Sequence, residues 1–267
     1  MEDKATLQDA LAMMRDLRVR CEWDARQTHD SLRPYLIEEA HELDEALRSA
    51  DVAAMRDELG DMLLQVLFHS VIAEEAREFA VGDVAGAMVG KMRRRHPHLF
   101  GAGERVPWEK MKASSRKSLA DGLPSGLPSL HRAHRLQERA AGVGFDWSDT
   151  DGPAQKVVEE LSEVRDLLAG RALPVDEENS GEPAPSGEDQ RAMEAELGDL
   201  LFACVNLCRK AGVHAAVALD RANEKFVRRF EGVEGLAAER GLVMGEAKLD
   251  ELDLLWDEVK RREISRP

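Results

Sequence analysis

One acidic pattern of helical type occurs twice in the sequence, and this repeat most restricts how the chain can fold. The two copies are Glu38-Glu39-x-x-Glu42 with Glu58-x-x-Asp61, and Glu159-Glu160-x-x-Glu163 with Glu196-x-x-Asp199. Residues three or four positions apart lie on one face of an α-helix. Leucine and valine residues flank the acids of the second copy, so these acids border apolar stripes that favour packing of the two helices side by side.

Two such helices packed together would bring four carboxylates to one point. A carboxylate cluster of this kind repels itself unless it is protonated or binds cations. Ligand sets made only of oxygen suit a hard ion such as Mg²⁺, for which Mn²⁺ is an expected substitute. A single acidic motif more often marks a solvated helix face, but its recurrence favours a metal site. The predicted ligands are Glu160, Glu163, Glu196 and Asp199 in the second copy, and Glu39, Glu42, Glu58 and Asp61 in the first.

Other residues recur in the same order around the acids, which indicates a tandem duplication. A tryptophan precedes each acidic pair, a Lys-x-x-x-Arg pattern follows it, and a Trp-x-x-x-Lys pattern comes last. The first copy has Trp23, Lys91, Arg95, Trp108 and Lys112, and the second has Trp147, Lys225, Arg229, Trp256 and Lys260. The loops differ in length, chiefly through an insertion from Gly170 to Gln190.

Together, the recurring residues suit a nucleoside polyphosphate. A lysine and an arginine four positions apart share a helix face and can hold phosphates. A tryptophan with a lysine one turn later offers a ring for a base and a further cation. Taken singly, such residues are more often surface cations and core tryptophans. Their joint occurrence with the acids is what predicts the site.

Charge and composition limit the partners of this chain. Its 267 residues carry a formal net charge of −15, which argues against non-specific binding of nucleic acid or membranes. Cys21, Cys204 and Cys208 form no disulfide framework, which fits a reducing cytosol. The N-terminus lacks a signal-peptide pattern, and the most apolar run, from Leu59 to Ala73, is too short and polar to cross a bilayer. We therefore expect a cytoplasmic protein without membrane or nucleic-acid partners.

The periodicity predicts an all-α fold with essentially no sheet, because no stretch shows persistent alternation of apolar and polar residues. The Gly/Pro/Ser-rich stretch before Ser129 reads as a linker, which predicts an N-terminal domain over 1–120 and a C-terminal domain over 121–267. The composition of about 170–190 predicts a mobile loop in the second domain. Helices are expected at about 7–18, 34–49, 52–76, 83–96, 129–141, 153–169, 189–211, 214–240 and 249–262.

At this point the sequence resembles the MazG family of nucleoside triphosphate pyrophosphohydrolases. Besides the acidic motifs, the matching segments are Trp23-Asp24, Arg94-Arg95-His96-Pro97-His98, Val143-Gly-Phe-Asp-Trp147, Asn223-Glu-Lys-Phe226 and Arg228-Arg229-Phe230. The matches cover nearly the whole chain. The resemblance implies two tandem helical-bundle domains and a homodimer whose helices build the sites. It also implies Mg²⁺-dependent hydrolysis of NTPs or dNTPs to the monophosphate and pyrophosphate.

The resemblance also assigns roles to residues of the second copy. It implies metal ligation by the four acids and nucleotide contacts from Lys156, Asn223, Lys225, Arg229, Trp256 and Lys260. Glu159 and Glu160 complete the nucleotide-binding set, and Glu159 is either a general base or an additional metal ligand. The first copy has Tyr35 in place of Lys156 and Val89 in place of Asn223. We therefore expect the C-terminal site to be the main one, with Lys91, Arg95, Trp108 and Lys112 serving phosphate and base in the other.

The expected reaction is in-line attack of a metal-activated water on the phosphorus next to the nucleoside, with Lys225 and Arg229 neutralising the departing pyrophosphate. One rival is a di-iron bundle, because Glu38-x-x-His41 has the Glu-x-x-His spacing of such proteins. Ser162 stands at the position of His41 in the second copy, which disfavours that interpretation. The other rival is a non-catalytic binding protein, and chelator-sensitive release of pyrophosphate separates it from an enzyme.

Overall fold

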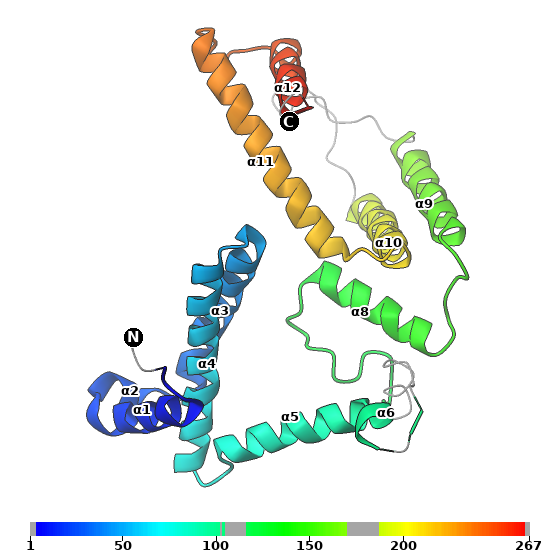
Figure 1. Ribbon diagram of the computed structural model, residues 1–267. Coiled ribbons are helices and arrows are strands. Elements are labelled where there is room, and N and C mark those ends of the chain that lie inside the picture. The colour runs from blue at the N-terminus through cyan, green and yellow to red at the C-terminus, as the bar shows by residue number, and fades with distance from the viewer. Residues whose placement is uncertain (1–3, 102, 105–115, 170–186, 265–267) are drawn as a thin grey trace. The chain divides into compact units, whose positions relative to one another are not determined.

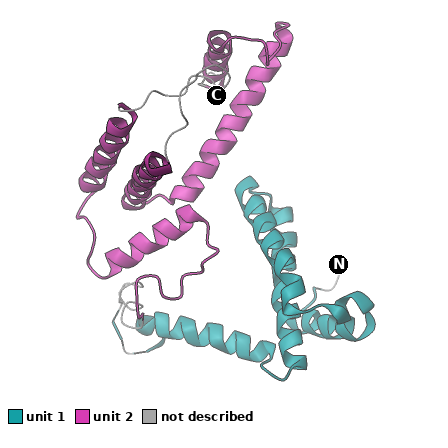
Figure 2. Cartoon of the chain, turned by 180° about the vertical axis from the view of Figure 1, so that it is seen from behind, with its two compact units in different colours: residues 1–105 teal, residues 106–267 magenta. Residues whose placement is uncertain are grey.

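The computed structural model describes residues 4–101, 103–104, 116–169 and 187–264. Within these residues the chain forms α-helices and connecting turns without a strand, which confirms the all-α prediction (Figure 1). Contacts divide it into two compact units, Met1–Arg105 and Val106–Pro267 (Figure 2). The boundary predicted near Asp121 falls after this division, in the connection that leads to α8, the first of the helices described in the second unit.

The first unit contains six described helices: α1 (Leu7–Arg20), α2 (Glu22–Arg26), α3 (His29–Ser49), α4 (Val52–Glu75), α5 (Val81–Arg95) and α6 (Pro97–Phe100). The long helices α3 and α4 pack together, α1 packs against α4, and α5 contacts α4 and α6. Leu11, Met14, Leu32, Phe68 and Val71 are buried where α1, α3 and α4 meet. This core holds the two acid-bearing helices at a fixed spacing.

The start of α3 differs from the sequence-based expectation. The helix begins at His29, not near Pro34, because Thr28 caps it. The Thr28 hydroxyl accepts from the backbone N–H of Ser31, and Ser31 Oγ accepts from the backbone N–H of Thr28 at 2.9 Å. Such reciprocal bonds satisfy donors that a helix end leaves free. Pro34 lies inside the helix, so the capped first turn precedes it.

The second unit contains five described helices: α8 (Ser129–Gly142), α9 (Asp151–Ala169), α10 (Gly187–Lys210), α11 (Ala215–Glu239) and α12 (Leu249–Ile264). Helix α9 packs along α10, α11 packs along α12, and α8 contacts both α10 and α11. The predicted mobile loop lies largely outside the described residues. Its last positions, 187–190, instead form the first turn of α10, where Glu188 and Asp189 complement the positive end of the helix.

Close helix contacts and a histidine cluster fix the second unit. Val233, Leu236 and Leu255 are buried between α11 and α12. Gly232 permits the approach, since a Cβ there would lie 3.0 Å from Cγ2 of Val259. At the junction of α8 and α11, the ring of His214 lies against those of His131 and His134, with centroids 4.6 Å and 4.2 Å apart.

Among the described residues no single helix is long and apolar enough to span a membrane, although the bent pair α10 and α11 has the required length and composition when the two are taken together.

Candidate metal and nucleotide site

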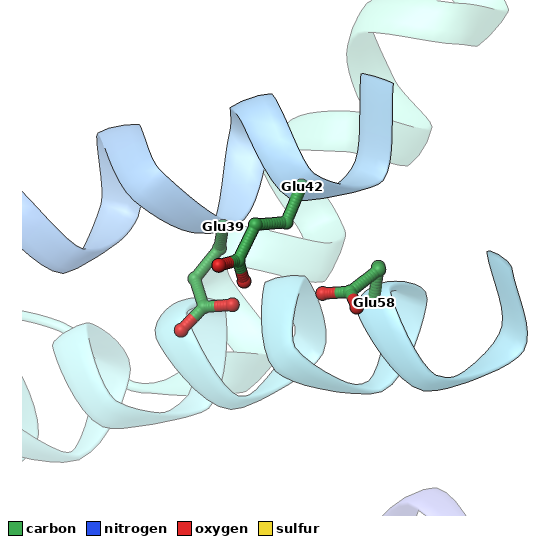
Figure 3. A group of neighbouring side chains, drawn as sticks. All are labelled: Glu39, Glu42 and Glu58. Atoms are coloured by element: carbon green, nitrogen blue, oxygen red, sulfur yellow. The ribbon is translucent and has the colours of Figure 1, made fainter. Parts of the chain in front are cut away.

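In the first unit the predicted acids converge between α3 and α4. Glu39 and Glu42 extend from α3, and Glu58 extends from α4 toward them (Figure 3). One carboxylate oxygen of each lies within 4.8 Å of the other two. Asp61 stands next to this group, since its charge acts on both Glu39 and Glu58. The i, i+3 spacing on each helix therefore produces the expected carboxylate cluster.

In the first cluster, burial and the neighbouring carboxylates raise the pKa of two glutamates. Burial raises the pKa of Glu39, and the charges of Asp61, Glu42 and Glu58 raise it further. Burial also raises the pKa of Glu58, and the charges of Glu42 and Asp61 raise it further. Oε2 of Glu58 is buried and hydrogen-bonds to no described residue. A buried acceptor without a donor among repelling carboxylates is the setting that a divalent cation stabilises.

The second unit repeats the arrangement between α9 and α10. Glu160, Glu196 and Asp199 have carboxylate oxygens within 4.8 Å of one another. Glu163, one turn after Glu160, hydrogen-bonds to Glu196. Burial raises the pKa of Glu163, and the charges of Glu160 and Glu196 raise it further. Three of the four predicted ligands therefore form one carboxylate group, and Glu163 borders it through Glu196. Glu160 is the most buried of the four, with 5% of its surface exposed.

Lys156 distinguishes the second cluster from the first. Its Nζ lies 2.6 Å from Oε1 of Glu160 and 2.9 Å from Oε1 of Glu159. These hydrogen bonds raise the pKa of Lys156, which therefore stays charged. The spacing follows from the helix, because Lys156 precedes these acids by three and four residues on α9. The corresponding position in the first unit is Tyr35, so no lysine from that position neutralises the first cluster.

The predicted phosphate and base contacts lie on α11 and α12. Arg229 is paired through Nε with Oε2 of Glu263 at 2.8 Å, and its guanidinium carbon lies 5.9 Å from the centre of the Trp256 ring. Phe226 also packs against Trp256, with the two ring centroids 5.5 Å apart. Lys260 pairs with Asp257 at 2.7 Å. Asn223 and Lys225 are exposed on the same helix as Arg229.

The structure thus brings the predicted residues together in two groups, not one. The acids and Lys156 lie on α9 and α10, whereas the cations and Trp256 lie on α11 and α12. Neither α11 nor α12 packs closely against α9 among the described residues. In the first unit Lys91 and Arg95 likewise lie on α5, which packs on α4 and α6. Trp108 and Lys112 lie outside the described residues.

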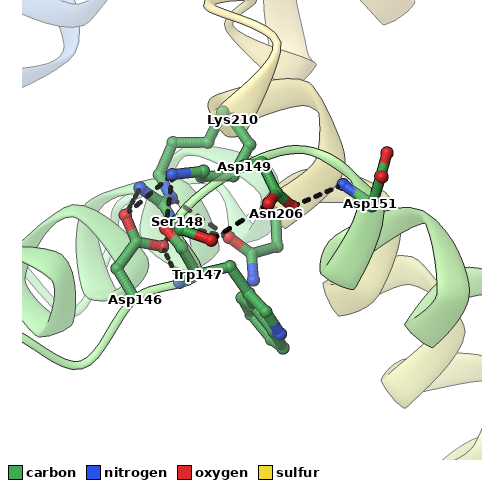
Figure 4. Close-up of polar contacts among 8 residues, drawn as sticks. Asp146, Trp147, Ser148, Asp149, Asp151, Asn206 and Lys210 are labelled. Atoms are coloured by element: carbon green, nitrogen blue, oxygen red, sulfur yellow. Dashed lines mark hydrogen bonds and ion pairs between the residues drawn. The ribbon is translucent and has the colours of Figure 1, made fainter.

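A polar network near the start of α9 was not predicted. Asp146 forms ion pairs with two cations: its Oδ1 lies 2.5 Å from Nη2 of Arg209, and its Oδ2 lies 3.4 Å from Nζ of Lys210. These ion pairs link the segment before α9 to the end of α10 (Figure 4). Lys210 also donates to the carbonyl oxygen of Trp147 at 2.7 Å. These cations lower the pKa of Asp146, with Arg209 the larger contributor. The sequence signal was the Phe-Asp-Trp segment itself, which helical periodicity does not explain.

Two all-α units, each with a carboxylate cluster between two packed helices, define a tandem helical protein with one acidic centre per unit. The sequence profile of the MazG nucleotide pyrophosphohydrolase domain matches this chain twice, over residues 27–100 and 152–233. Both matches contain the acid-bearing helices. The chain belongs to the MazG family.

Curated relatives extend the match over nearly the full length. The chain is 39% identical over 263 residues to a nucleoside triphosphate pyrophosphohydrolase of Escherichia coli K12, with 94% of each chain covered. It is 42% identical over 247 residues to the nucleoside triphosphate pyrophosphohydrolase/pyrophosphatase MazG of Thermotoga maritima, covering 90% of this chain and 89% of that one. A Mycobacterium tuberculosis nucleoside triphosphate pyrophosphohydrolase is 43% identical over 169 residues, with half of its length covered.

Proposed function

We propose that the chain is a Mg²⁺-dependent nucleoside triphosphate pyrophosphohydrolase that converts NTPs or dNTPs to the nucleoside monophosphate and pyrophosphate. It is a hydrolase that acts on phosphoric anhydride bonds, as the family and the names of the relatives indicate. The observation that carries the finer proposal is the convergence of carboxylates between paired helices in both units. Groups that offer only anionic oxygen bind hard divalent cations, and such cations accompany the phosphates of nucleotides.

The donor set fits Mg²⁺. Glu160, Glu163, Glu196 and Asp199 would hold the ion in the second unit, and Glu39, Glu42, Glu58 and Asp61 would hold it in the first. The unpartnered, buried Oε2 of Glu58 supports this assignment. When bound, Mg²⁺ supplies charge neutralisation at phosphoryl oxygens and acidifies water. Mn²⁺ has the same preference for oxygen ligands and is the expected substitute.

The remaining residues of the site manage charge. Lys156 keeps Glu159 and Glu160 from repelling an incoming polyphosphate, and its own ammonium group can turn to a phosphate oxygen. Glu159 is exposed and lies next to the ligands, where it can accept a proton from the attacking water. Lys225 and Arg229 stabilise the charge that grows on the departing pyrophosphate. Glu263 accepts a hydrogen bond from Nε of Arg229, and a guanidinium carries five N–H donors.

The second unit is proposed as the main site. Lys156 and Asn223 give it two polar groups whose counterparts in the first unit are Tyr35 and Val89. The first unit retains the acids but offers neither the lysine beside them nor the amide. We expect it to be weak, differently specific or mainly structural.

A homodimer is proposed because the second unit leaves large apolar side chains exposed along its helices. Leu161 is 46% exposed, Leu197 is 42% exposed and Leu201 is 60% exposed, all on the helices that carry the acids. On α11, Phe226 and Val227 are more than half exposed next to Lys225. Apolar surface of this kind marks protein interfaces when it is contiguous. A second copy would cover these helix faces and can bring cations of one α11 toward acids of the other subunit.

The test is a nucleotide panel with product identification. Wild type with Mg²⁺ should release pyrophosphate and the monophosphate, and EDTA should abolish the release. The pair Glu160→Gln and Glu163→Gln should abolish most turnover, whereas Glu39→Gln with Glu42→Gln, the matched pair in the first unit, should leave most of it. Activity that survives the first pair and disappears with the second would overturn the ranking of the two sites. Orthophosphate as the product would overturn the pyrophosphohydrolase assignment.

A further inference from the structure

The segment that leads into α9 is fastened at its first end to α10. Asp146 forms ion pairs with Arg209 and Lys210, which lie in the last turn of α10 (Figure 4). Lys210 also donates to the carbonyl oxygen of Trp147 at 2.7 Å. The side chains of Arg209, Lys210 and Asp146 are 12%, 16% and 22% exposed, so solvent screens these pairs less than it screens pairs on the open surface. The start of the segment is therefore held to α10 by directional contacts.

The second end of the segment is fixed to the first turn of α9. Oδ1 of Asp149 accepts a hydrogen bond from the backbone N–H of Asp151 at 3.0 Å, and Ser148 donates to Oδ2 of the same carboxylate at 3.0 Å. The ring of Trp147 lies against this turn, because a Cβ at Gly152 would stand 2.0 Å from Cδ1 of the ring. A side chain that satisfies a free backbone N–H fixes the direction in which a helix starts. The segment therefore links the beginning of α9 to the end of α10.

The α10 side of this link is itself well supported. Gln137 of α8 is 5% exposed, and its Nε2 donates to the carbonyl oxygen of Phe202 on α10 at 2.8 Å. Within α10, Oδ1 of Asn206 accepts from Nε of Arg209 at 3.2 Å and from Nη2 at 2.7 Å. The guanidinium of Arg209 is thus held in place while it pairs with Asp146. The end of α10 serves as the fixed support on which α9 is placed.

The acid cluster needs such a link, because its own forces do not hold α9 and α10 in alignment. Carboxylates that share one site repel one another, and apolar packing between helices is non-directional. A slide of one helical turn is about 5.4 Å, which exceeds the 4.8 Å within which oxygens of Glu160, Glu196 and Asp199 meet. Smaller displacements matter as well, because Mg²⁺ requires its oxygen ligands at about 2.0–2.1 Å.

We propose that Asp146 is a positioning residue that fixes the alignment of α9 on α10 and so assembles the metal ligands before a cation arrives. It acts through Arg209, Lys210 and the first turn of α9. Glu160 follows Asp151, the first residue of α9, by nine positions, or about 2.5 turns of one helix. The link consists of groups of this chain and is complete without an ion. The inference rests on the proposed metal site and adds to it a residue outside the ligand set.

The experiment measures Mn²⁺ affinity by electron paramagnetic resonance. A background of Glu39→Gln and Glu42→Gln makes the second cluster dominate the signal. Asp146→Ala removes both ion pairs of the link and should weaken Mn²⁺ binding by on the order of tenfold, as the loss of contacts that orient metal ligands does. The Mg²⁺ concentration for half-maximal release of pyrophosphate should rise by a similar factor. Excess Mg²⁺ should then restore much of kcat, because the ligands themselves are unchanged.

The matched control is Glu258→Ala on α12. Glu258 also pairs with two cations, Arg240 at 2.6 Å and Arg262 at 2.7 Å, and its side chain is 27% exposed. It joins α12 to the end of α11, so it stabilises the same unit without touching the link between α9 and α10. The control should lower the thermal unfolding midpoint, as Asp146→Ala does, and leave Mn²⁺ affinity unchanged.

Two further variants test whether the contacts act as one link. Arg209→Met removes the other half of the main ion pair, and combining it with Asp146→Ala should weaken Mn²⁺ binding no further than Asp146→Ala alone. Losses that multiply in the double variant would overturn the inference. If Asp146→Ala does not fold, as judged by circular dichroism, Lys210→Met removes one ion pair and the bond to the carbonyl of Trp147. That variant should also bind Mn²⁺ more weakly than wild type.

Unchanged Mn²⁺ affinity in Asp146→Ala, or an equal loss in Glu258→Ala, would overturn the inference and leave the link with a role in stability alone. A wild-type protein that binds Mn²⁺ but releases no pyrophosphate would overturn the proposed activity, and the comparison of affinities would still decide the role of Asp146. A wild-type protein that binds no Mn²⁺ would overturn the metal site and this inference together.

Discussion

Replacing Lys156 by methionine should change metal binding and catalysis in opposite directions. Lys156 places its ammonium 2.6 Å from Oε1 of Glu160, a predicted metal ligand. A dication bound to that oxygen would stand within several ångströms of this positive charge. The lysine therefore weakens binding of the ion by repulsion, while it strengthens binding of the anionic polyphosphate by attraction. Methionine keeps much of the volume and removes the charge. The variant should therefore bind Mn²⁺ more tightly in the absence of nucleotide and hydrolyse NTPs more slowly.

The size of the effect follows from the exposure of the lysine. Its side chain is 40% exposed, so solvent screens the repulsion and a water-like dielectric applies. Repulsion between a dication and one charge about 4 Å away is then about 2 kcal/mol, which corresponds to roughly thirtyfold in affinity. Loss of a phosphate-binding cation should lower kcat/KM by roughly 10².

Free Mn²⁺ measured by electron paramagnetic resonance gives the affinity. The measurement is made in a background of Glu39→Gln and Glu42→Gln, so that the second cluster dominates the signal. Lys156→Arg retains the charge and should leave Mn²⁺ affinity near that of wild type. In the first unit, Tyr35→Lys is the reciprocal change; measured in a background of Glu160→Gln and Glu163→Gln, it should weaken Mn²⁺ binding there. Weaker Mn²⁺ binding in Lys156→Met would refute the electrostatic reasoning, because removing a cation cannot then be the dominant effect.

Three further predictions follow from the geometry. Burial and neighbouring carboxylates raise the pKa of Glu39, so Glu39→Gln removes one repelling charge from the first cluster. Without divalent ions, the thermal unfolding midpoint at pH 7.5 should therefore rise. The increase in that midpoint on adding Mg²⁺ should be smaller than in wild type. Burial lowers the pKa of both His134 and His214. Glu138 raises the pKa of His134, whereas Arg209 and Arg135 lower it further. The neighbouring rings of His134 and His131 lower the pKa of His214 further. Below about pH 6.5 the unfolded chain therefore binds more protons than the folded one, so the free energy of unfolding, measured with urea, should fall as the pH drops. The fall should be at most ~1.4 kcal/mol per pH unit for each proton. An equally steep fall in His214→Gln would contradict this prediction. Lys225→Ala should reduce kcat by about 10² with the fold intact by circular dichroism, and turnover within twofold of wild type would show that its role is misassigned.

Local rules account for the parts of the fold and site that were predicted from the sequence. The i, i+3 spacing placed Glu160 with Glu163 and Glu196 with Asp199 on their helices, and the adjoining apolar stripes paired those helices. The start of α3 was misplaced because Pro34 was taken as the start, whereas Thr28 completes a capping box that a helix can satisfy upstream of a proline.

The remaining features depend on contacts between distant segments. Gln137 and the carbonyl of Phe202 that orients it are 65 residues apart, and Arg209 and Asp146 are 63 apart. No periodicity within one helix reports such pairs. The same holds for α11 and α12, whose apolar faces pair with each other, so that Arg229 meets Glu263 and Trp256 and not the acids of its own α9.

The sequence by itself determined that the chain is helical, duplicated and acidic at two matched places, because helix periodicity and charge are properties of neighbours along the chain. Tertiary structure decided which carboxylate oxygens meet, and that Lys156 neutralises one centre through Glu160. The reason is that side-chain packing selects among helix pairings that local sequence leaves equally possible.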